Sequence, residues 1–264
     1  MIPYFQFNYF VVGFLTIHVW GLLVATGIIC AVTLGRKLTK KYLLSEDVFL
    51  DLVIWVLVSA IFFARIFHVV FYNFDFYVIH PSEILKFWQG GQSSLGGFFG
   101  AAVAIYLFAK LRHFKMIDFW PYLDIMAISY FLGQGIGRIG CFLIHDHVGI
   151  LSNSFLAVKF PYGSRFDLGL LESLFVFVIF GIFYKLFNKL ISKRWGIVSV
   201  YSFMIYAVGR FFLDFLRATD LVDSDPRYLH LTAAQWGMII IVLILTGTIF
   251  SDRIRQVFKK RDNL

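Results

Sequence analysis

Long apolar stretches constrain the fold of this chain more than any other feature of its sequence. A transmembrane helix needs about 20 mostly apolar residues. Seven stretches approach or exceed that length, the third being short on its apolar count: 11–33, 49–72, 95–111, 119–143, 168–190, 197–216 and 233–250. Charged residues make up only 15% of the chain, against roughly 25% in soluble domains. The sequence therefore predicts an all-α integral membrane protein, a seven-transmembrane helix bundle in a single domain (1–264), and excludes the water-soluble classes.

Basic residues gather in the loops after the first, third and fifth predicted spans and in the C-terminal tail. Cytoplasmic loops carry such an excess of Lys and Arg. The pattern predicts an external N-terminus, a cytoplasmic C-terminus and short external segments at about 73–94, 144–167 and 217–232. The net charge of +8 is then mostly a topology signal, and we expect no nucleic-acid partner.

The N-terminal region and the two cysteines add two smaller expectations. No basic residue precedes the first apolar run, whereas a secretory signal peptide begins with a basic segment. We therefore expect a retained first span. Cys30 and Cys141 fall at opposite membrane faces in this topology, so a disulfide between them is not expected.

Three arginines, Arg65, Arg138 and Arg210, fall inside predicted spans and at a similar depth, near the external ends. A charge within a membrane is costly and indicates a functional site by default. Other polar residues lie at the same depth: His18, Trp20, Glu172, Asp214 and Gln235. The simplest interpretation is one arginine-rich cavity in the outer leaflet. Because guanidinium groups suit phosphate and carboxylate, the ligand would be a phospholipid headgroup or a carboxylate-bearing solute.

Two structural alternatives compete with that interpretation. An arginine near a helix end can extend its charged group to the interface, which would explain Arg65 or Arg210 taken singly. Arg210 and Asp214 also stand at i and i+4, where an ion pair can serve the helix alone.

Glycines surround Arg138 in the stretch GQGIGRIGCF (133–142). Gly133 and Gly137 form a GxxxG pair, which lets transmembrane helices approach closely. Gly135 and Gly140 add flexibility, and exposed backbone there could approach a headgroup. A second stretch, WQGGQSSLGGFFGA (88–101), allows the third span to begin earlier, or a re-entrant turn, which is tolerated only where it lines protein or water.

The stretch HDHVG (145–149) contains possible metal ligands, His145, Asp146 and His147. Their spacing is weak support for a metal site, and no further His or Cys obviously completes it. We expect a polar turn at the membrane interface, no metal and no organic cofactor.

An ordered set of short motifs carries a family resemblance. GRIGCF (137–142), with Gly149 after HDHVG, is similar to a signature of the form G-R-x-G-N/C-F followed by a polar turn and Gly. Further motifs follow the same order along the chain: IPYF (2–5), IHVWGLLVATG (17–27), ARIFHVVFYN (64–73), WQGGQSSLGG (88–97), Glu172 in DLGLLE, YAVGRFFLDFLR (206–217) and Gln235. The set resembles the prolipoprotein diacylglyceryl transferases, enzymes of the bacterial cytoplasmic (inner) membrane.

The chain departs from the family pattern at four places. Leu95 stands where the family has a histidine to which an essential, possibly base-like, role is assigned. Trp20 stands where Tyr is frequent, and Asp214 where Glu is common. The external segment between spans 4 and 5 is short. These departures indicate a divergent member.

The resemblance implies transfer of the diacylglyceryl group of phosphatidylglycerol to the lipobox cysteine of a prolipoprotein signal peptide, forming a thioether and releasing glycerol phosphate. Preorganised cations would stabilise the leaving phosphate. We expect catalytic roles for Arg138, Arg210, Asp214 and Glu172. The expected substrate-binding residues are Arg138, Arg65, Tyr206, Gly137, Gly140, Gly149, Trp20 and His145.

The sequence does not identify the group that takes the thiol proton. Without a histidine at 95, the candidates are His18, His145, His147, Glu172 and Asp214. Cys141 is expected to be a small packing residue, because its position varies between Asn and Cys in the family.

Two other classes of function compete with the enzyme. One is a non-catalytic or specialised phospholipid-binding membrane protein derived from the family, which is compatible with Leu95. A transporter fits less well, because its path would need polar residues across the membrane, whereas the buried charges crowd at one face, Asp51 and Asp124 being the nearest exceptions.

The departure at position 95 generates a test. If the replacement of the family histidine by Leu95 lowers activity, Leu95→His should raise the rate of diacylglyceryl transfer. The rate is measured with labelled phosphatidylglycerol and a lipobox peptide. An unchanged or lower rate would mean that the site works differently in this chain.

Overall fold

The computed structural model describes residues 1–72, 74–86, 90–221 and 227–261. Residues 87–89, which overlap the Gly-rich stretch 88–101, and residues 222–226 of the predicted external segment lie outside the described residues. The chain divides into two compact units, Met1–Ala31 with Ala127–Leu264, and Val32–Met126. We call them the outer-chain unit and the inner-chain unit, after their places in the sequence.

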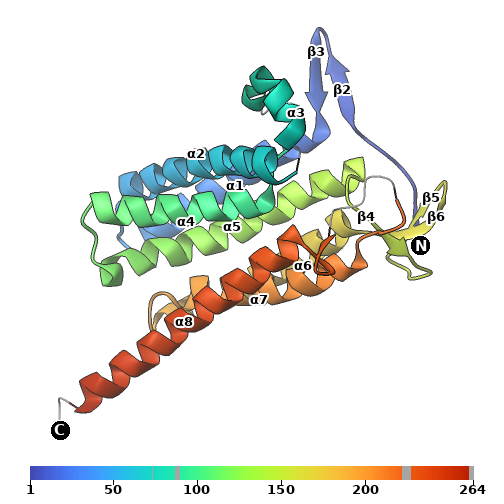
Figure 1. Ribbon diagram of the computed structural model, residues 1–264. Helices are drawn as coiled ribbons and strands as arrows, with labels where there is room; N and C mark the ends of the chain where they lie inside the picture. The colour runs from blue at the N-terminus through green and yellow to red at the C-terminus, as the bar shows by residue number, and fades with distance from the viewer. Residues whose placement is uncertain (73, 87–89, 222–226, 262–264) are drawn as a thin grey trace. The chain divides into compact units, whose positions relative to one another are not determined.

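The described residues contain seven helices long and apolar enough to cross a membrane, which confirms the predicted fold class (Figure 1). They are α1 (Val19–Lys41), α2 (Glu46–Phe71), α4 (Ser94–Leu111), α5 (Met116–Ile144), α6 (Leu168–Ile191), α7 (Ile197–Leu213) and α8 (Ala233–Arg261). Shorter helices are α3 (Phe74–Ile79), and the 3-10 turns η1 (Pro81–Leu85) and η3 (Asp214–Leu216). Most ends agree with the sequence-based bounds within a few residues.

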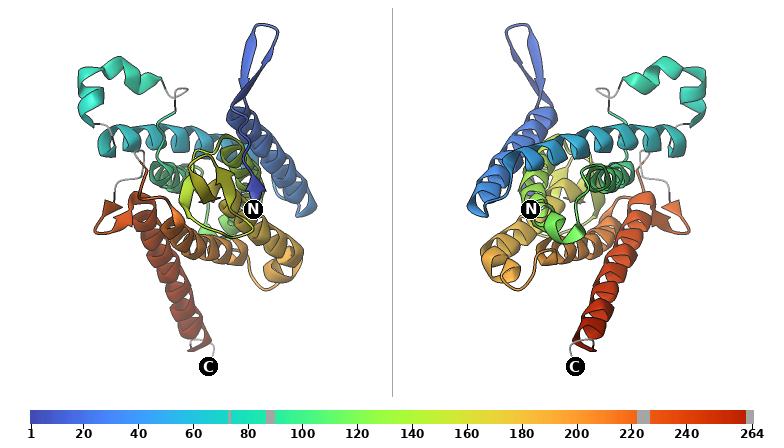
Figure 2. Two further views of the ribbon diagram at one scale, coloured as in Figure 1. Left: turned by 90° about the vertical axis from the view of Figure 1, so that its right-hand side faces the viewer. Right: turned by 90° about the vertical axis from the view of Figure 1, so that its left-hand side faces the viewer.

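The first predicted span, 11–33, is wrong at both ends, because α1 begins at Val19 and continues to Lys41. Residues 9–18 form a β-hairpin of β2 (Tyr9–Val12) and β3 (Leu15–His18), which stands away from α1 in both views of Figure 2. Gly13, at φ +62°, opens a two-residue turn, and glycine is the residue that such a turn favours there. Apolarity alone could not separate this hairpin from a helix, so His18 lies in a strand and Trp20 in the first helical turn.

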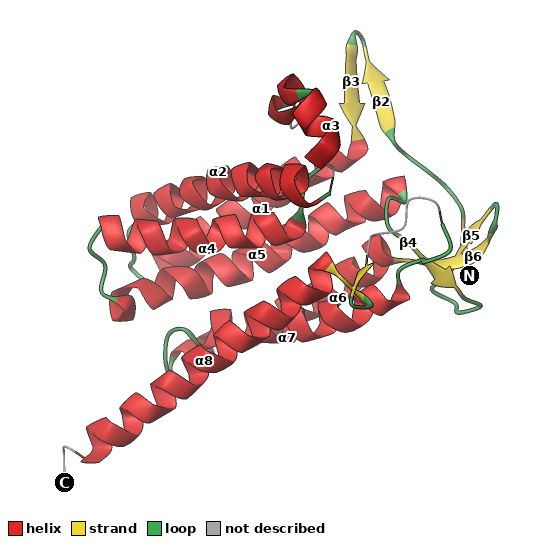
Figure 3. Cartoon of the chain, viewed as in Figure 1, coloured by secondary structure: helices red, strands yellow, loops and turns green. Residues whose placement is uncertain are grey.

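A four-stranded sheet at one end of the outer-chain unit was not predicted from the sequence (Figure 3). Its order is β1 (Ile2–Pro3), β5 (Val158–Phe160), β6 (Gly163–Asp167) and β4 (Val148–Leu151). Strand β4 follows α5 after three residues, and β6 runs directly into α6. Asp167 caps α6 by accepting the amide hydrogen of Leu170 at 3.0 Å. The sheet therefore fixes the adjacent ends of α5 and α6.

Glycines set the helix contacts within the outer-chain unit. A Cβ on Gly133 of α5 would lie 2.9 Å from the carbonyl oxygen of Gly27 in α1, so the two backbones touch, as the GxxxG interpretation requires. The partner glycine of that motif, Gly137, leaves ordinary room, 3.7 Å to Val24. Gly169 of α6 packs on the backbone of Cys141 and Phe142, which brings α5 and α6 together near Arg138.

In the inner-chain unit α2 packs along α4. Cβ atoms added at Gly96 and Gly100 would lie 2.4 Å from the carbonyl oxygen of Phe63 and 2.5 Å from that of Ser59. The hydroxyl of Ser59 donates to the carbonyl of Gly100 at 2.7 Å. Helix α4 starts at Ser94, so the described part of the Gly-rich stretch is mostly a helix-packing surface and not a re-entrant turn.

This packing predicts unequal effects of two neighbouring glycines in α4. Gly100→Ala should cost about 1–3 kcal/mol, because the added methyl group meets the backbone of Ser59 and overpacks the contact. Gly97→Ala is the matched control, since nothing lies within 4 Å of its Cβ position and alanine favours the helix. Thermal unfolding in detergent should show a lower Tm only for Gly100→Ala; equal Tm values would contradict the close packing.

Candidate active site

A buried carboxylate, Glu172 near the start of α6, is the centre of the polar cluster in the outer-chain unit. Its Oε2 lies 3.1 Å from Nη2 of Arg138 and 3.3 Å from Nε of Arg210. The hydroxyl of Tyr206 donates to Oε1 at 2.9 Å, and the amide of Gln134 lies 3.5 Å from the same atom. Glu172 is 1% exposed. Helices α5, α6 and α7 thus meet on one carboxylate.

A second carboxylate extends the cluster toward α8. Asp214, at the end of α7, accepts from Nη1 of Arg210 at 2.7 Å and lies 3.4 Å from Nε of Arg217. The hydroxyl of Thr232 donates to its other oxygen. Gln235 in turn accepts from the backbone amide of Thr232 at 2.9 Å and donates to the carbonyl of Phe211 at 3.2 Å. These contacts fix the start of α8 against the end of α7.

The cluster keeps a net positive charge. Three guanidinium groups, of Arg138, Arg210 and Arg217, face two carboxylates, of Glu172 and Asp214. Arg138 and Arg217 are its partly exposed members, with 14% and 18% of their side chains accessible, whereas Arg210 is 7% accessible. We call the side of the cluster formed by these two partly exposed residues the accessible edge. It presents guanidinium groups, which suit an anionic group of phosphate size.

The accessible edge continues with Cys141, Asp146 and His147, which each bring one metal-ligating atom within 4.8 Å of the others. The expectation that nothing completes the HDH stretch is therefore wrong, because Cys141 joins Asp146 and His147, while His145 does not. Arginines flank the group: Nη1 of Arg138 lies 3.7 Å from Sγ of Cys141, and Nη2 of Arg217 lies 3.1 Å from Nδ1 of His147. Two guanidinium groups so close disfavour a cation, so we assign no metal here.

The surroundings of His147 and Asp146 shift their pKa values. Burial, together with the positive charges of Arg138 and Arg217, lowers the pKa of His147 to about 3. Burial raises the pKa of Asp146, an effect that Arg138 partly offsets. The imidazole of His147 is therefore neutral at neutral pH.

His145 is fixed by both ring nitrogens. Nδ1 lies 2.7 Å from Oδ2 of Asp167 and Nε2 lies 2.6 Å from the carbonyl oxygen of Phe5. The ring also stacks on Tyr4, with centroids 5.2 Å apart. Since His145 is 7% exposed, these contacts favour a structural role over the substrate contact expected from the sequence.

The other residues expected in the site have mainly packing surroundings. A Cβ on Gly149 would lie 2.6 Å from the carbonyl oxygen of Leu216, where Gly149 pairs with Arg217 in a β-bridge. Gly140 packs on the backbone and ring of Trp20, a residue that is 42% exposed. Tyr206 is 2% exposed and serves Glu172.

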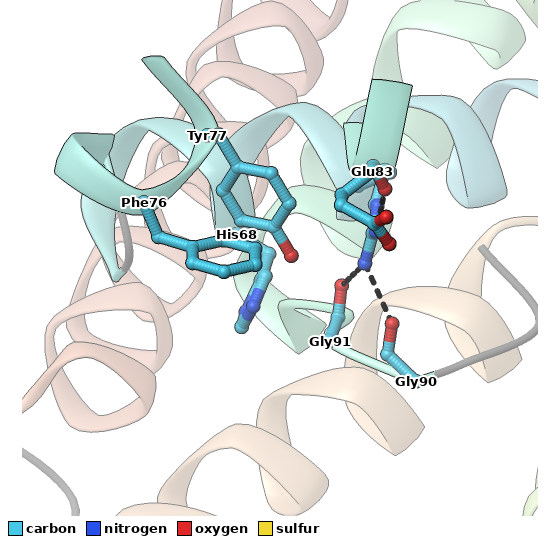
Figure 4. Close-up of a pocket in the computed structure, with 7 residues that line it drawn as sticks. His68, Phe76, Tyr77, Glu83, Gly90 and Gly91 are labelled. Atoms are coloured by element: carbon cyan, nitrogen blue, oxygen red, sulfur yellow. Dashed lines mark hydrogen bonds between the residues drawn. The ribbon is translucent and has the colours of Figure 1, made fainter. Parts of the chain in front are cut away.

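Arg65 lies in the inner-chain unit, where its guanidinium group meets backbone carbonyls. Nε donates to Ile84 at 2.9 Å, Nη1 to Gly90 at 2.6 Å and Gly91 at 3.0 Å, and Nη2 to Glu83 at 2.6 Å and Lys86 at 3.4 Å. Gly90 and Gly91 line a cavity of about 230 Å³ together with His68, Phe76 and Tyr77; Figure 4 shows these residues around it. Because every donor has an acceptor, Arg65 stabilises this turn, and a role in substrate binding remains only an expectation.

Sequence reasoning missed Arg217 and the joining of Cys141 with Asp146 and His147. Arg217 was assigned to an external loop, although it stands three residues after Asp214, a spacing at which side chains on a helical turn meet. Asp146 and His147 follow the end of α5, and hydropathy gives no depth for residues outside the spans.

The fold describes a multi-pass membrane protein, and the cluster places three arginines on two carboxylates where α5 and α7 end and α6 and α8 begin. The family described as prolipoprotein diacylglyceryl transferase matches residues 8–251. A protein of Bacillus velezensis named phosphatidylglycerol–prolipoprotein diacylglyceryl transferase is 32% identical over 267 residues, 96% of this chain and 94% of the relative. Proteins with the same name from Trichormus variabilis and Limosilactobacillus reuteri are 32% and 29% identical, covering 82% and 88% of this chain and 80% and 88% of their own lengths. The chain belongs to the prolipoprotein diacylglyceryl transferase family.

The position of Glu172 predicts a large loss of stability when its charge is removed. Glu172→Gln leaves Arg138 and Arg210 without their shared counter-ion, and breaking a buried ion pair costs roughly 3–5 kcal/mol. Glu46→Gln is a control, because the partners of Glu46, Arg36 and Lys40, are largely exposed. Thermal unfolding in detergent should give a Tm lower by about 10 °C for Glu172→Gln and nearly unchanged for Glu46→Gln. Equal Tm values would contradict the central role of Glu172.

Proposed function

We propose that this chain transfers the diacylglyceryl group of phosphatidylglycerol to a cysteine thiol of a prolipoprotein. The observation that carries the proposal is the guanidinium cluster held on Glu172 and Asp214, which combines a net positive charge with two partly exposed arginines. The names of the relatives, which cover most of this chain, support the same reaction.

In the proposed reaction the thiolate sulfur attacks the glyceryl carbon that carries the phosphate. A carbon–sulfur bond forms, the carbon–oxygen bond breaks, and glycerol phosphate leaves with the electron pair. The charge on the leaving phosphate grows as that bond breaks, so preorganised donors near it lower the barrier. We assign this role to Arg138 and Arg210, with Arg217 added on the structural ground that it lies on the accessible edge.

The two carboxylates give the arginines their fixed positions. Glu172 holds Arg138 and Arg210 together, and Asp214 holds Arg210 and Arg217. Fixed cations need no reorganisation when charge develops. We therefore regard Glu172 and Asp214 as positioning residues, and the direct contact with phosphate falls to the arginines.

We further propose where the site lies in the membrane and which protein substrate reaches it. The basic loops of the sequence favour an external N-terminus and a cytoplasmic C-terminus, and the cluster lies at the ends of α5 and α7 and the starts of α6 and α8. It would then face the outer leaflet of the bacterial cytoplasmic membrane. The lipobox cysteine of a prolipoprotein signal peptide would reach it there.

Loss of Arg138 is the direct test. Arg138→Ala should reduce transfer by at least about 100-fold, the usual cost of removing one donor to a developing anion, while the protein stays in the membrane. Arg112→Ala is a matched control, because Arg112 pairs with Asp51 at an exposed site. The assay supplies labelled phosphatidylglycerol in spheroplasts and a lipobox peptide with an impermeant charged tag outside.

Three outcomes would oppose the proposal. Normal turnover by Arg138→Ala would remove the headgroup role of this arginine. Labelling of the peptide only in inverted vesicles would reverse the orientation. Lipid binding by the wild-type chain without transfer would favour the non-catalytic alternative that Leu95 leaves open.

A further inference from the structure

We infer that His147 accepts the proton of the attacking thiol in this chain, in place of the histidine that Leu95 replaces. The inference rests on the proposed function and names a further catalytic residue for it. His147 lies beside the arginine cluster, with Nδ1 3.1 Å from Nη2 of Arg217 and a ring nitrogen within 4.8 Å of Sγ of Cys141. Its side chain is 25% exposed, so a substrate thiol can reach it.

The other candidates have contacts that oppose the role. His145 has both ring nitrogens engaged, by Asp167 and the carbonyl of Phe5. Glu172 is buried between two arginines, and a carboxylate stabilised in that way is a weak base. Asp214 is likewise paired with Arg210 and Arg217 and accepts from Thr232.

His18 is a weaker candidate for a different reason. It ends strand β3 and is exposed, opposite Tyr9 in the hairpin. Its ring contacts that of Tyr9, at a centroid distance of 6.3 Å, and it is not a member of the guanidinium cluster as described above.

The tautomer of His147 decides whether it can accept a proton. Nδ1 lies 2.9 Å from the backbone carbonyl oxygen of Asp146. With the hydrogen on Nδ1, the ring donates to that carbonyl and leaves the lone pair of Nε2 for the thiol. With the hydrogen on Nε2, Nδ1 accepts from Arg217 instead, and the ring cannot serve.

Charged groups from five segments surround the imidazole. Arg138 and Cys141 come from α5, Asp146 from the turn after it, Glu172 from α6, Arg210 from α7 and Arg217 from the turn after η3. Burial disfavours imidazolium, and so does the positive field of the arginines, which Glu172 partly offsets. An anionic phosphate bound to the arginines would offset that field and raise the pKa of His147 toward its ordinary value. The headgroup would thereby strengthen the base.

The proton balance closes with the products. The S–H hydrogen moves to Nε2, and the thiolate forms the carbon–sulfur bond as the carbon–oxygen bond breaks. The phosphodiester monoanion becomes a monoester dianion, whose protonation has a pKa of about 6. The imidazolium can pass its hydrogen to that phosphate or to water, which returns neutral His147.

The experiment compares His147→Asn and His147→Ala with His113→Asn. The side-chain amide of asparagine can still donate to the carbonyl of Asp146 as Nδ1–H does, but it cannot take a proton. His113 is an exposed histidine at φ +52°, a conformation that asparagine tolerates. The steady-state parameters of transfer are measured from pH 6 to 10 with labelled phosphatidylglycerol and a lipobox peptide.

A proton acceptor predicts a specific pattern. His147→Asn should lower kcat by at least about 100-fold at pH 7 with KM for phosphatidylglycerol within about threefold. The deficit should shrink as the pH approaches 10, because a thiol with a pKa near 8.5 ionises without a base. Added imidazole should restore part of the activity of His147→Ala, and His113→Asn should behave as the wild type.

The opposite results separate the two proposals. Wild-type rates for His147→Asn at every pH, or a deficit that neither pH nor imidazole relieves, would overturn the role of His147 and leave the transferase intact. A wild-type chain that transfers nothing would overturn the proposed function and this inference with it.

Discussion

The shared ion pair of Glu172 with Arg138 and Arg210 is the interaction on which the functional end of the bundle depends. A guanidinium group in a low-dielectric region is costly unless it is paired and hydrogen-bonded, and two of them side by side also repel. Glu172 relieves both costs at once, and Tyr206 completes its hydrogen bonds. Because its partners come from α5 and α7, one carboxylate fixes three helices at a single point.

The small sheet gives that point its rigidity. Strand β4 leaves α5 and strand β6 enters α6, so the turn after Arg138 and the turn before Glu172 are held by one set of hydrogen bonds. Asp167 acts in both directions, because it caps α6 and binds His145 just after α5. Gly169 lets the two backbones touch between these anchors. A β structure that hydropathy does not reveal thus keeps a charged site in register within a helical membrane protein.

The parts of the structure that were predicted from the sequence all depend on the length and position of apolar stretches. Long apolar stretches have few alternatives to a transmembrane helix, so all seven were recognised, and equal depth brought Arg138, Glu172 and Arg210 together correctly. Depth does not say which way a side chain faces around its helix, and Arg65, at a similar depth, turns to carbonyls of its own unit. Hairpin residues 9–18 are as apolar as a transmembrane span. The strands within residues 145–167 are too short to be recognised from the sequence. Both segments depend on tertiary contacts.

The electrostatics of the site also bear on the order in which substrates would bind. A thiolate and a phosphate are both anions, and each is stabilised by the guanidinium groups of Arg138 and Arg217. Burial and those groups suppress proton uptake by His147, so a thiol that arrived before the lipid would meet a weak base. Once a phosphate partly neutralises the arginines, the imidazole becomes a stronger acceptor and the thiol can lose its proton beside the carbon that it attacks. If His147 has this role, the lipid headgroup should bind before the thiol ionises, and the positive charge that holds the leaving group would also delay formation of the nucleophile until that group is in place.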